Sequence, residues 1–487
     1  MAPSYLIFRH EKVGILDLFR LLFTRRRLTE YGFVECSAET ALELGDGTWI
    51  IGVVESIHKF LSSIRVPLSI FGCVYEFILN LLSLNGGLLG LLWRLLTVSV
   101  IIPRRGSKNF RSFIGHIDGR VDLYKGAHSL SSSFPLTHLQ KDAPDINLLD
   151  LTMMAAKLAY ENEAYIKEVV THHWKMDFVQ FFNCWNNFLP DANRATTQAF
   201  IFCDKASDPK VICLAFRGTA TFDAEEWKTD FDFSSISMGG KMGSVHLGFM
   251  KALGLQDDKD FANGFPKDPP ANTGDKPLAY YAIRQYLSAL HANHPNAKIM
   301  VTGHSLGAAL AALFPALLAF HGESGILNSI GVATYGQPRV GDEAFASFMD
   351  ATLGDNYGRM VYRYDLAARV PPDVTWVDYL YFRHFGTCRY FSDWYQYEEV
   401  SEMPNKNYFY WKDYLRLYGY AWWDFFRAIF LGWTQGKDFA ESWTSLVFRT
   451  VPVILIPILG PGIASHSPRD YLNAVRLSKR RVVKDMV

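Results

Sequence analysis

One serine in this chain of 487 residues has the surroundings of a catalytic nucleophile. Ser305 is the middle residue of a Gly-His-Ser-Leu-Gly sequence at 303–307. The apolar segment 298–302 before it predicts a short buried strand, and the helix-forming segment 308–320 after it predicts a helix. The serine is therefore expected on the sharp strand-to-helix turn where hydrolases expose a nucleophilic hydroxyl.

The two glycines that flank this serine leave room for such a turn, because they carry no side chain. The turn also brings the first amides of the next helix, that of Leu306 before the others, beside the serine. A helix N-terminus offers unpaired N–H groups and the positive end of the helix dipole. The sequence thus predicts that the Leu306 amide stabilises the oxyanion formed when a carbonyl is attacked.

A nucleophilic serine needs a base and a carboxylate that orients it, and after a turn of this kind the acid comes next in the chain. Asp365 is the preferred acid because it follows an apolar strand and precedes the loop 366–372. Asp350, Asp373 and Asp378 remain alternatives. A simple turn-capping role for Asp365 is the competing interpretation.

Two histidines compete for the role of the base. His466 belongs to Gly-Ile-Ala-Ser-His-Ser-Pro-Arg-Asp-Tyr-Leu at 462–472, a loop just before a helix, where a ring can turn into a site. His384 belongs to the strand-like stretch Tyr-Phe-Arg-His-Phe-Gly at 381–386, which suits a buried structural residue. We favour His466 as the group that takes the proton of the serine.

The composition narrows the class of protein. Lys plus Arg and Asp plus Glu both total 49, so no global charge favours nucleic acid binding. Hydrophobic residues make up 49% and charged residues only 20%, which is more apolar than an ordinary soluble protein. The six cysteines have no disulfide or metal-ligand spacing and are expected to be reduced. The first residues lack the pattern of a secretory signal, so secretion is not expected.

A long apolar segment at 66–102 contains only two charged side chains, Glu76 and Arg94. Asn-Gly-Gly at 85–87 interrupts it, which predicts two apolar arms joined by a turn. Each arm is near the lower limit for crossing a bilayer, so a hairpin that enters one lipid monolayer fits better. Basic residues flank both ends and suit anionic head groups. A pair of buried helices is the alternative interpretation.

We divide the chain into an N-terminal lipid-anchoring region, 1–141, and a catalytic region, 142–487. In the first region, Arg20 and the three arginines at 25–27 lie in the apolar stretch 15–28. This pattern fits either an amphipathic helix on a lipid surface or a solvated helix face.

The catalytic region is predicted to be α/β, because apolar strands alternate with helices along it. The result would be a mainly parallel sheet with helices on its faces. The segment 257–276, rich in Pro, Gly, Asn and Asp, predicts a surface loop. Helices are expected at 148–160 and 278–291, and strands at 198–203, 211–216, 298–302, 329–335 and 360–364.

Several separate motifs give residues 148–472 a resemblance to the fungal-type class 3 lipases, which are α/β-hydrolases. Ala-Phe-Arg-Gly-Thr at 215–219 resembles the oxyanion loop of that family. The resemblance implies that Thr219 contributes its amide and hydroxyl, beside the Leu306 amide. Glu-Trp-Lys-Thr-Asp at 226–230 is similar to the family's lid and hinge, which would make Trp227 a lid tryptophan.

The resemblance continues through the rest of the catalytic region. Val-His-Leu-Gly-Phe at 245–249 and Tyr-Gly-Gln-Pro-Arg-Val-Gly at 335–341 are similar to family segments, and the first implies a structural His246. His466 with Tyr471 matches the family's catalytic histidine turn, and His384 corresponds to its mid-strand histidine.

The acid loop departs from the family's Asn-Asp-x-Val-Pro pattern. Around Asp365, Tyr364 stands for the Asn, Ala367 for the Val and Ala368 for the Pro.

An aromatic-rich insertion at 387–463 departs further from the fungal pattern. Aromatic residues gather at 408–411, 418–426 and 430–433, and the uncharged segment 451–463 follows. This density suits a membrane–water interface, and a packed helical pair is the alternative. Together with the apolar N-terminal segment, the insertion makes the chain resemble the plant oil-body triacylglycerol lipases within class 3.

The resemblance implies a triacylglycerol lipase that releases fatty acids by a Ser-His-Asp acyl-enzyme mechanism and needs no metal or organic cofactor. The expected partners are a triacylglycerol or related acyl-lipid substrate and a lipid-droplet monolayer or membrane surface. The expected location is the cytosolic face of the lipid droplet (oil body), or alternatively the endoplasmic reticulum membrane. A phospholipase A1, galactolipase or diacylglycerol lipase would use the same residues. Acyl transfer, a non-catalytic lipid-droplet scaffold and any oligomeric state remain open.

Overall fold

The computed structural model describes most of the chain, namely residues 3–24, 26–124, 145–187, 194–255, 264–270, 275–373, 381–408, 411–435, 439, 441–455 and 460–480. Some expectations fall outside these ranges: Asp378 as an alternative acid, Arg25 in the basic cluster, and parts of 257–276, 408–411 and 451–463.

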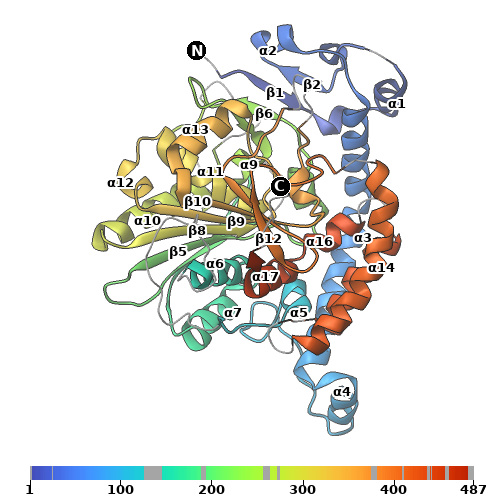
Figure 1. The fold of residues 1–487 in the computed structure, drawn as a ribbon, viewed down its shortest axis with the longest axis vertical. Coiled ribbons are helices and arrows are strands. Elements are labelled where there is room, and N and C mark those ends of the chain that lie inside the picture. Colours follow the sequence, from blue (N-terminus) through green and yellow to red (C-terminus); the bar gives the residue numbers. More distant parts are fainter. Residues whose placement is uncertain are drawn as a thin grey trace, which may run out of the picture.

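A nine-stranded sheet forms the centre of the described structure (Figure 1). Its strand order is β13-β12-β11-β10-β9-β8-β5-β4-β3. β5, β8, β9, β10 and β11 are parallel to one another, and antiparallel pairing begins only toward the two edges. This arrangement confirms the predicted mainly parallel α/β sheet. The strands are β3 (Asp177–Cys184), β4 (Thr197–Cys203), β5 (Val211–Phe216), β8 (Lys298–His304), β9 (Ile330–Tyr335), β10 (Tyr357–Tyr362), β11 (Thr387–Phe391), β12 (Gln396–Val400) and β13 (Lys479–Arg480).

Helices cover both faces of this sheet. In Figure 1, α10 (Ala279–Asn293), α11 (Leu306–Phe320) and α13 (Glu343–Leu353) lie over one face, and α6 (Asp145–Leu158) and α17 (Pro468–Leu477) lie over the other. The other helices are α1 (Ile15–Phe23), α2 (Ala38–Glu43), α3 (Trp49–Leu84), α4 (Gly87–Leu96), α5 (Phe113–Ile117), α7 (Glu163–Glu168), α8 (Ala224–Asp230), α9 (Leu247–Ala252), α12 (Ser324–Leu327), α14 (Trp411–Thr434), α15 (Trp443–Leu455) and α16 (Gly460–Ser465).

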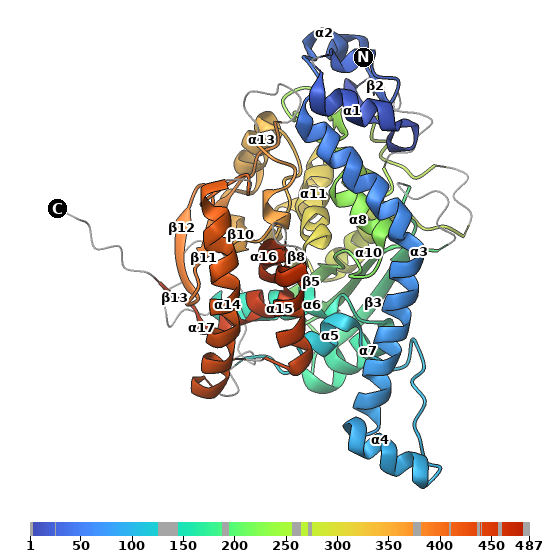
Figure 2. The ribbon, with the colours of Figure 1, turned by 90° about the vertical axis from the view of Figure 1, so that its right-hand side faces the viewer.

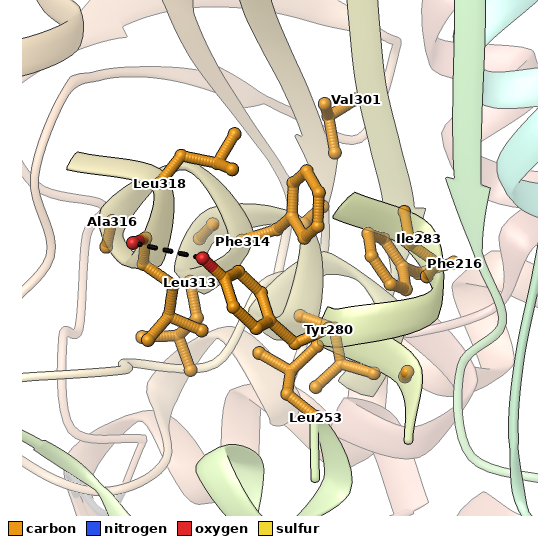
Figure 3. Packing of buried hydrophobic residues seen from close by; sticks show 14 of the residues in the cluster. Phe216, Leu253, Tyr280, Ile283, Val301, Leu313, Phe314, Ala316 and Leu318 are labelled. Atoms are coloured by element: carbon orange, nitrogen blue, oxygen red, sulfur yellow. Dashed lines mark hydrogen bonds between the residues drawn. The ribbon is translucent and has the colours of Figure 1, made fainter. Parts of the chain in front are cut away.

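The helix that follows the serine is buried along most of its length. α11 is rich in alanine, and these small side chains let its backbone approach β8 and β9 closely. Phe314 on this helix packs between Phe216 and Tyr280, with ring centroids 6.0 and 5.8 Å away (Figure 3). The Tyr280 hydroxyl donates to the Leu317 carbonyl at 3.3 Å. The second half of α11 is therefore held against β5 and α10.

The N-terminal region is joined to the catalytic region by a second, smaller sheet. Its order is β2-β1-β6-β7, with β2 (Val34–Cys36), β1 (Tyr5–Phe8), β6 (Ser235–Ser237) and β7 (Ser244–His246). β1 pairs directly with β6, which follows the lid segment in sequence. The first residues of the chain thus lie beside the lid rather than in a separate body.

The apolar segment 66–102 has a different form from the equal-armed hairpin predicted for it. α3 already begins at Trp49 and runs for 36 residues, which corresponds to about 54 Å. The predicted turn is present, since Gly86 has φ +80° and separates α3 from the ten-residue α4. Only 11% of the most apolar part of α3 is buried, so the alternative of two buried helices is not what the fold shows. By length and composition α3 could cross a membrane.

The polar residues within this apolar segment bind the chain that returns along α3. The Asn85 side chain donates to the Ile101 carbonyl and accepts from the Ile101 amide, at 2.8 and 2.9 Å. Asn80 makes the same pair of bonds with Arg111, and Glu76 accepts from the Phe113 amide. These side chains satisfy backbone groups that would otherwise lie unpaired against an apolar helix.

The first part of the insertion 387–463 extends the central sheet as β11 and β12. Its aromatic part forms the helices α14 and α15, which pack together and also expose aromatic side chains such as Trp433 and Trp443. The alternative of a packed helical pair is therefore present, and part of its aromatic surface is exposed. Figure 2 shows α1, α3, α4, α14 and α15 on one side of the molecule.

Candidate active site

Ser305 occupies the strand-to-helix turn between β8 and α11 with φ 59° and ψ −131°, a backbone conformation that a residue with a side chain rarely adopts. Its amide donates to the Tyr335 carbonyl at 3.0 Å. A Cβ on Gly303 would lie 2.2 Å from the backbone of Gly307, and a Cβ on Gly307 would lie 2.4 Å from the Phe216 carbonyl oxygen. Both flanking positions therefore require glycine.

The structure brings Asp365 and His466 together beside this serine. Asp365 lies three residues beyond the end of β10, and its Oδ2 is 2.8 Å from Nδ1 of His466. Since a carboxylate only accepts, Nδ1 carries the proton and Nε2 is left with its lone pair. Nε2 is buried and has no hydrogen-bond partner among the described residues. It is free to take a proton from Ser305, which lines the same cavity.

The carboxylate of Asp365 is held by further donors. Its Oδ1 accepts from the amides of Ala367 and Ala368, at 2.8 and 3.3 Å. The Tyr471 hydroxyl donates to Oδ2, the oxygen that also faces His466. The side chain is fully buried, so these bonds fix both oxygens in place.

The competing candidates lie elsewhere. His384 lies outside any strand, between β10 and β11, and its Nε2 is 2.8 Å from the Ala368 carbonyl, to which it donates. Burial, followed by nearby arginines, holds the pKa of His384 well below its usual value, so the ring is neutral and steadies the acid loop. Asp350 accepts from the Gly386 amide, and Asp373 forms an ion pair with Lys406.

The loop expected to bind the oxyanion packs directly on the serine turn. A Cβ on Gly218 would lie 2.0 Å from the Tyr160 hydroxyl, so only glycine permits this approach. Thr219 follows and lines the cavity beside Ser305. Leu306 is the first residue of α11, where an amide has no acceptor within the helix. Two amides from different segments are thus available near the nucleophile.

The Thr219 hydroxyl is oriented by a residue whose role the sequence did not indicate. It donates to Oδ2 of Asp230 at 2.8 Å, so it points at that carboxylate. Burial raises the pKa of Asp230 to about 7, against the hydrogen bond from Thr219 and the nearby His466, which both lower it. Asp230 was visible only as the last residue of the lid motif.

Ser305 and His466 line a mainly apolar cavity of about 400 Å³. Its other polar lining residues include Thr219, Tyr160 and His304. Among the described residues, no group of three or more His, Cys, Asp or Glu side chains has a metal-binding arrangement. Apolar lining residues come from segments far apart in sequence and include Ile57, Leu61, Leu68, Phe222, Trp227 and Phe448.

Comparison with known proteins places this site in a family. The family described as "Lipase (class 3)" matches residues 213–375. A Nicotiana tabacum protein named "Triacylglycerol lipase OBL1" is 37% identical over 98% of this chain and 95% of its own length. The Arabidopsis thaliana protein of the same name is 36% identical with the same coverage. This chain belongs to the class 3 lipases.

A lipase of Rhizopus niveus is 28% identical but covers only 55% of this class 3 lipase and 67% of its own length. The plant relatives, in contrast, match nearly the whole chain. The similarity to the plant proteins therefore extends over nearly all of this class 3 lipase, beyond the share that the Rhizopus niveus lipase covers.

Helix α8, which carries the motif expected for the lid, forms polar contacts with the loop expected to bind the oxyanion. Glu226 on α8 forms an ion pair with Arg217 at 2.5 Å, and it accepts from the Ala220 amide at 2.8 Å. Trp227 donates through Nε1 to the Thr221 carbonyl at 3.2 Å, and its ring lines the cavity. The tryptophan expected in the lid thus lines the same cavity as Ser305.

His304, the residue before Ser305, packs against His466 and forms a hydrogen bond to its backbone. Its ring centroid is 4.4 Å from that of His466, and its Nε2 donates to the His466 carbonyl at 2.9 Å. Its Nδ1 then accepts from the Tyr160 hydroxyl at 2.8 Å. Burial, followed by the proximity of His466, holds the pKa of His304 well below its usual value, so this ring stays neutral. The sequence carried no signal for this role.

Proposed function

We propose that this class 3 lipase hydrolyses triacylglycerol at the surface of lipid droplets, with Ser305 as nucleophile, His466 as base and Asp365 as orienting acid. The observation that carries the proposal is the buried Asp365–His466 pair, whose free Nε2 faces the cavity of the strained Ser305. The plant relatives named as triacylglycerol lipases support the choice of substrate.

The reaction follows from these positions. Nε2 of His466 takes the proton of Ser305 as its Oγ attacks the ester carbonyl. The amides of Thr219 and Leu306 stabilise the oxyanion, each contributing about 3 kcal/mol to the transition state. The protonated His466 then gives its proton to the departing glycerol oxygen, which leaves an acyl-enzyme. A water activated by the same nitrogen attacks this ester and releases the fatty acid.

The proposed location rests on five helices that lie on one side of the molecule (Figure 2) and that carry exposed apolar side chains. α4 exposes most of its leucines, and α1, α3, α14 and α15 expose further large apolar residues. Soluble proteins rarely leave such an extended apolar surface in contact with water. A lipid monolayer on the cytosolic side would cover it without requiring any helix to cross a bilayer.

A substrate panel tests the activity. Purified protein and its Ser305→Ala variant are compared for fatty-acid release from emulsified trioleoylglycerol, dioleoylglycerol, phosphatidylcholine and a galactolipid. We expect release mainly from trioleoylglycerol and its loss in the variant. Release mainly from a polar lipid would keep the mechanism and replace the substrate, and release that survives in Ser305→Ala would refute the nucleophile.

The location is tested by charge on α4. Leu89→Lys combined with Leu96→Lys should move the protein from isolated lipid droplets into the soluble fraction, because both side chains are exposed and far from the cavity. Leu42→Lys on α2, an equally exposed leucine, is the matched control. Droplet association that survives the double substitution would contradict an anchoring role for α4. Deletion of 66–102 is unsuitable because it removes Leu68 from the cavity wall.

A further inference from the structure

We propose that α3, the helix expected to rest on lipid, also forms the wall that binds the acyl chain of the substrate, so that the chain enters the site sideways from the lipid. This inference rests on the proposed function, because it concerns how the same site takes up its ester. It assigns to the N-terminal region a part in substrate binding as well as in anchoring.

One face of α3 lines the active-site cavity. Ile57, Phe60, Leu61 and Leu68 all contribute to it, at spacings that repeat along one side of a helix. Each is apolar, whereas polar lining residues such as Ser305, Thr219 and His466 come from the catalytic region. An acyl chain attached to the reacting carbonyl would therefore run along α3.

The opposite wall comes from the insertion. Phe448 on α15 and Ile463 on α16 line the cavity together with Leu366 from the acid loop. An aromatic cluster connects α3 to this wall: the ring centroid of Phe113 lies 5.8 Å from that of Tyr75 on α3 and 5.3 Å from that of Phe448. The N-terminal region and the insertion thus both contribute to the cavity, together with the catalytic region.

The mouth of the cavity coincides with the exposed apolar surface. Phe60 lines the cavity and yet is 60% exposed, so it stands at the rim. Two to four turns further along α3, Ile70 and Val74 are also exposed and lie outside the cavity lining. In Figure 2, α3 and α15 share the side that would meet the lipid. A chain leaving the lipid would therefore pass Phe60 before it reaches the serine.

Polar contacts hold this part of α3 in a fixed position against the catalytic region. His10 lies between Glu55 of α3 and Asp232, at 3.0 and 3.2 Å. The ring of His58 stacks on that of His10, and its Nε2 donates to the carbonyl of Phe231. Phe231 also lines the cavity. The charged groups around His10 and His58 also include Lys228 on the lid helix. The wall is therefore placed by contacts of Glu55 and His58, which flank Ile57 in the helix, independently of any lipid.

The size of the cavity fits one chain of the substrate. About 400 Å³ is at the lower end of the roughly 300–1,000 Å³ typical of small-molecule sites. One acyl chain would enter it while the remaining chains of a triacylglycerol stay in the droplet. Narrowing the wall should then penalise long acyl chains more than short ones.

The test compares two tryptophan substitutions on α3. Leu61→Trp fills part of the cavity, whereas Ile70→Trp adds the same ring on the exposed face of the same helix. Both are assayed on p-nitrophenyl palmitate and p-nitrophenyl butyrate in the same mixed micelles. We expect the palmitate-to-butyrate ratio of kcat/KM to fall by about tenfold in Leu61→Trp, since small changes in an apolar pocket discriminate by that order. The ratio should stay unchanged in Ile70→Trp.

A second variant covers the case in which the larger side chain disturbs folding. Leu61→Ala removes contacts from the wall, so it should raise KM for palmitate by a larger factor than KM for butyrate. The inference would be overturned if both Leu61 variants kept the wild-type palmitate-to-butyrate ratio and still hydrolysed butyrate. If Ser305→Ala lost butyrate hydrolysis in the same assay, the proposed function would stand. Turnover of both esters that does not depend on Ser305 would instead overturn the proposed function.

Discussion

The substitution Asp365→Asn tests the catalytic geometry sharply, because the structure fixes which way the new amide must face. Oδ1 of Asp365 accepts from two backbone amides, those of Ala367 and Ala368. Oδ2 accepts from Nδ1 of His466 and from the Tyr471 hydroxyl. An asparagine keeps its carbonyl oxygen toward the two backbone donors, so its NH₂ group faces the histidine.

An NH₂ group opposite Nδ1 forces His466 into the tautomer that carries its proton on Nε2. Such a ring cannot take the proton of Ser305, so turnover depends on the molecules in which the amide has flipped. The flip leaves two buried backbone N–H groups without an acceptor, at a cost of about 1–3 kcal/mol each. A total of about 2–6 kcal/mol leaves roughly 3% to 0.004% of the molecules competent.

The kcat of Asp365→Asn should therefore fall by about 30-fold at least and by up to about 10⁴-fold. The assay is the steady-state hydrolysis of p-nitrophenyl butyrate, with circular dichroism and thermal unfolding to show that the fold persists. Asp350→Asn, which changes a carboxylate outside the site, is the control and should keep its turnover. A loss of less than tenfold in Asp365→Asn would refute the role of this carboxylate.

Three further predictions use other parts of the structure. His466→Ala should lower kcat by about 10⁴-fold or more, whereas His384→Ala should mainly lower the melting temperature; the reverse result would exchange the two roles. Thr219→Val should lower kcat and Thr219→Ser should restore it, because the hydroxyl alone pairs with the buried Asp230; equal rates in both variants would contradict this. Burial lowers the pKa of His10, but hydrogen bonds to two carboxylates outweigh it and raise the pKa to about 9 from 6.5. Its stabilisation is thus complete below pH 6.5 and is lost as the pH rises through 9. Between pH 6.5 and 9, the unfolding free energy of the wild type should fall by about 3 kcal/mol relative to that of His10→Gln. If urea titrations gave the same difference between the two proteins at every pH, this role of His10 would be excluded.

The nucleophile and its turn could be predicted because their signals are local. An apolar strand, a glycine on each side of Ser305 and a helix former afterwards all lie within a short segment. The structure shows that each glycine is required by a backbone approach of less than 2.5 Å. The parallel sheet was predictable for the same reason, since strands such as β5 and β9 are short, mostly apolar runs.

The start of α3 was missed because its first turns carry polar side chains. Glu55 and His58 interrupt the apolar pattern, and their partners, His10 and the segment around Asp232, come from distant parts of the chain. No periodicity in the sequence reveals such pairs. The cavity wall of α3 was missed with it, because the apolar segment seemed to begin only at Val66.

The supporting residues of the site were also beyond a sequence-based prediction. His304 steadies His466 across the gap between β8 and the loop before α17, and Asp230 orients Thr219 from the lid. Each contact depends on how two separate loops meet over the sheet. Only the folded structure shows that His304 contacts His466 and that Asp230 contacts Thr219.

Labelling with a fluorophosphonate ester tests the central claim most directly, because the reagent reacts only with an activated serine. Peptide mass spectrometry of the labelled protein identifies the modified residue, and the labelling rate is compared in wild type, His466→Ala and His384→Ala. We predict phosphonylation of Ser305 at a rate that falls by about 100-fold or more in His466→Ala and persists in His384→Ala. Label on another serine, or an unchanged rate in His466→Ala, would contradict the account.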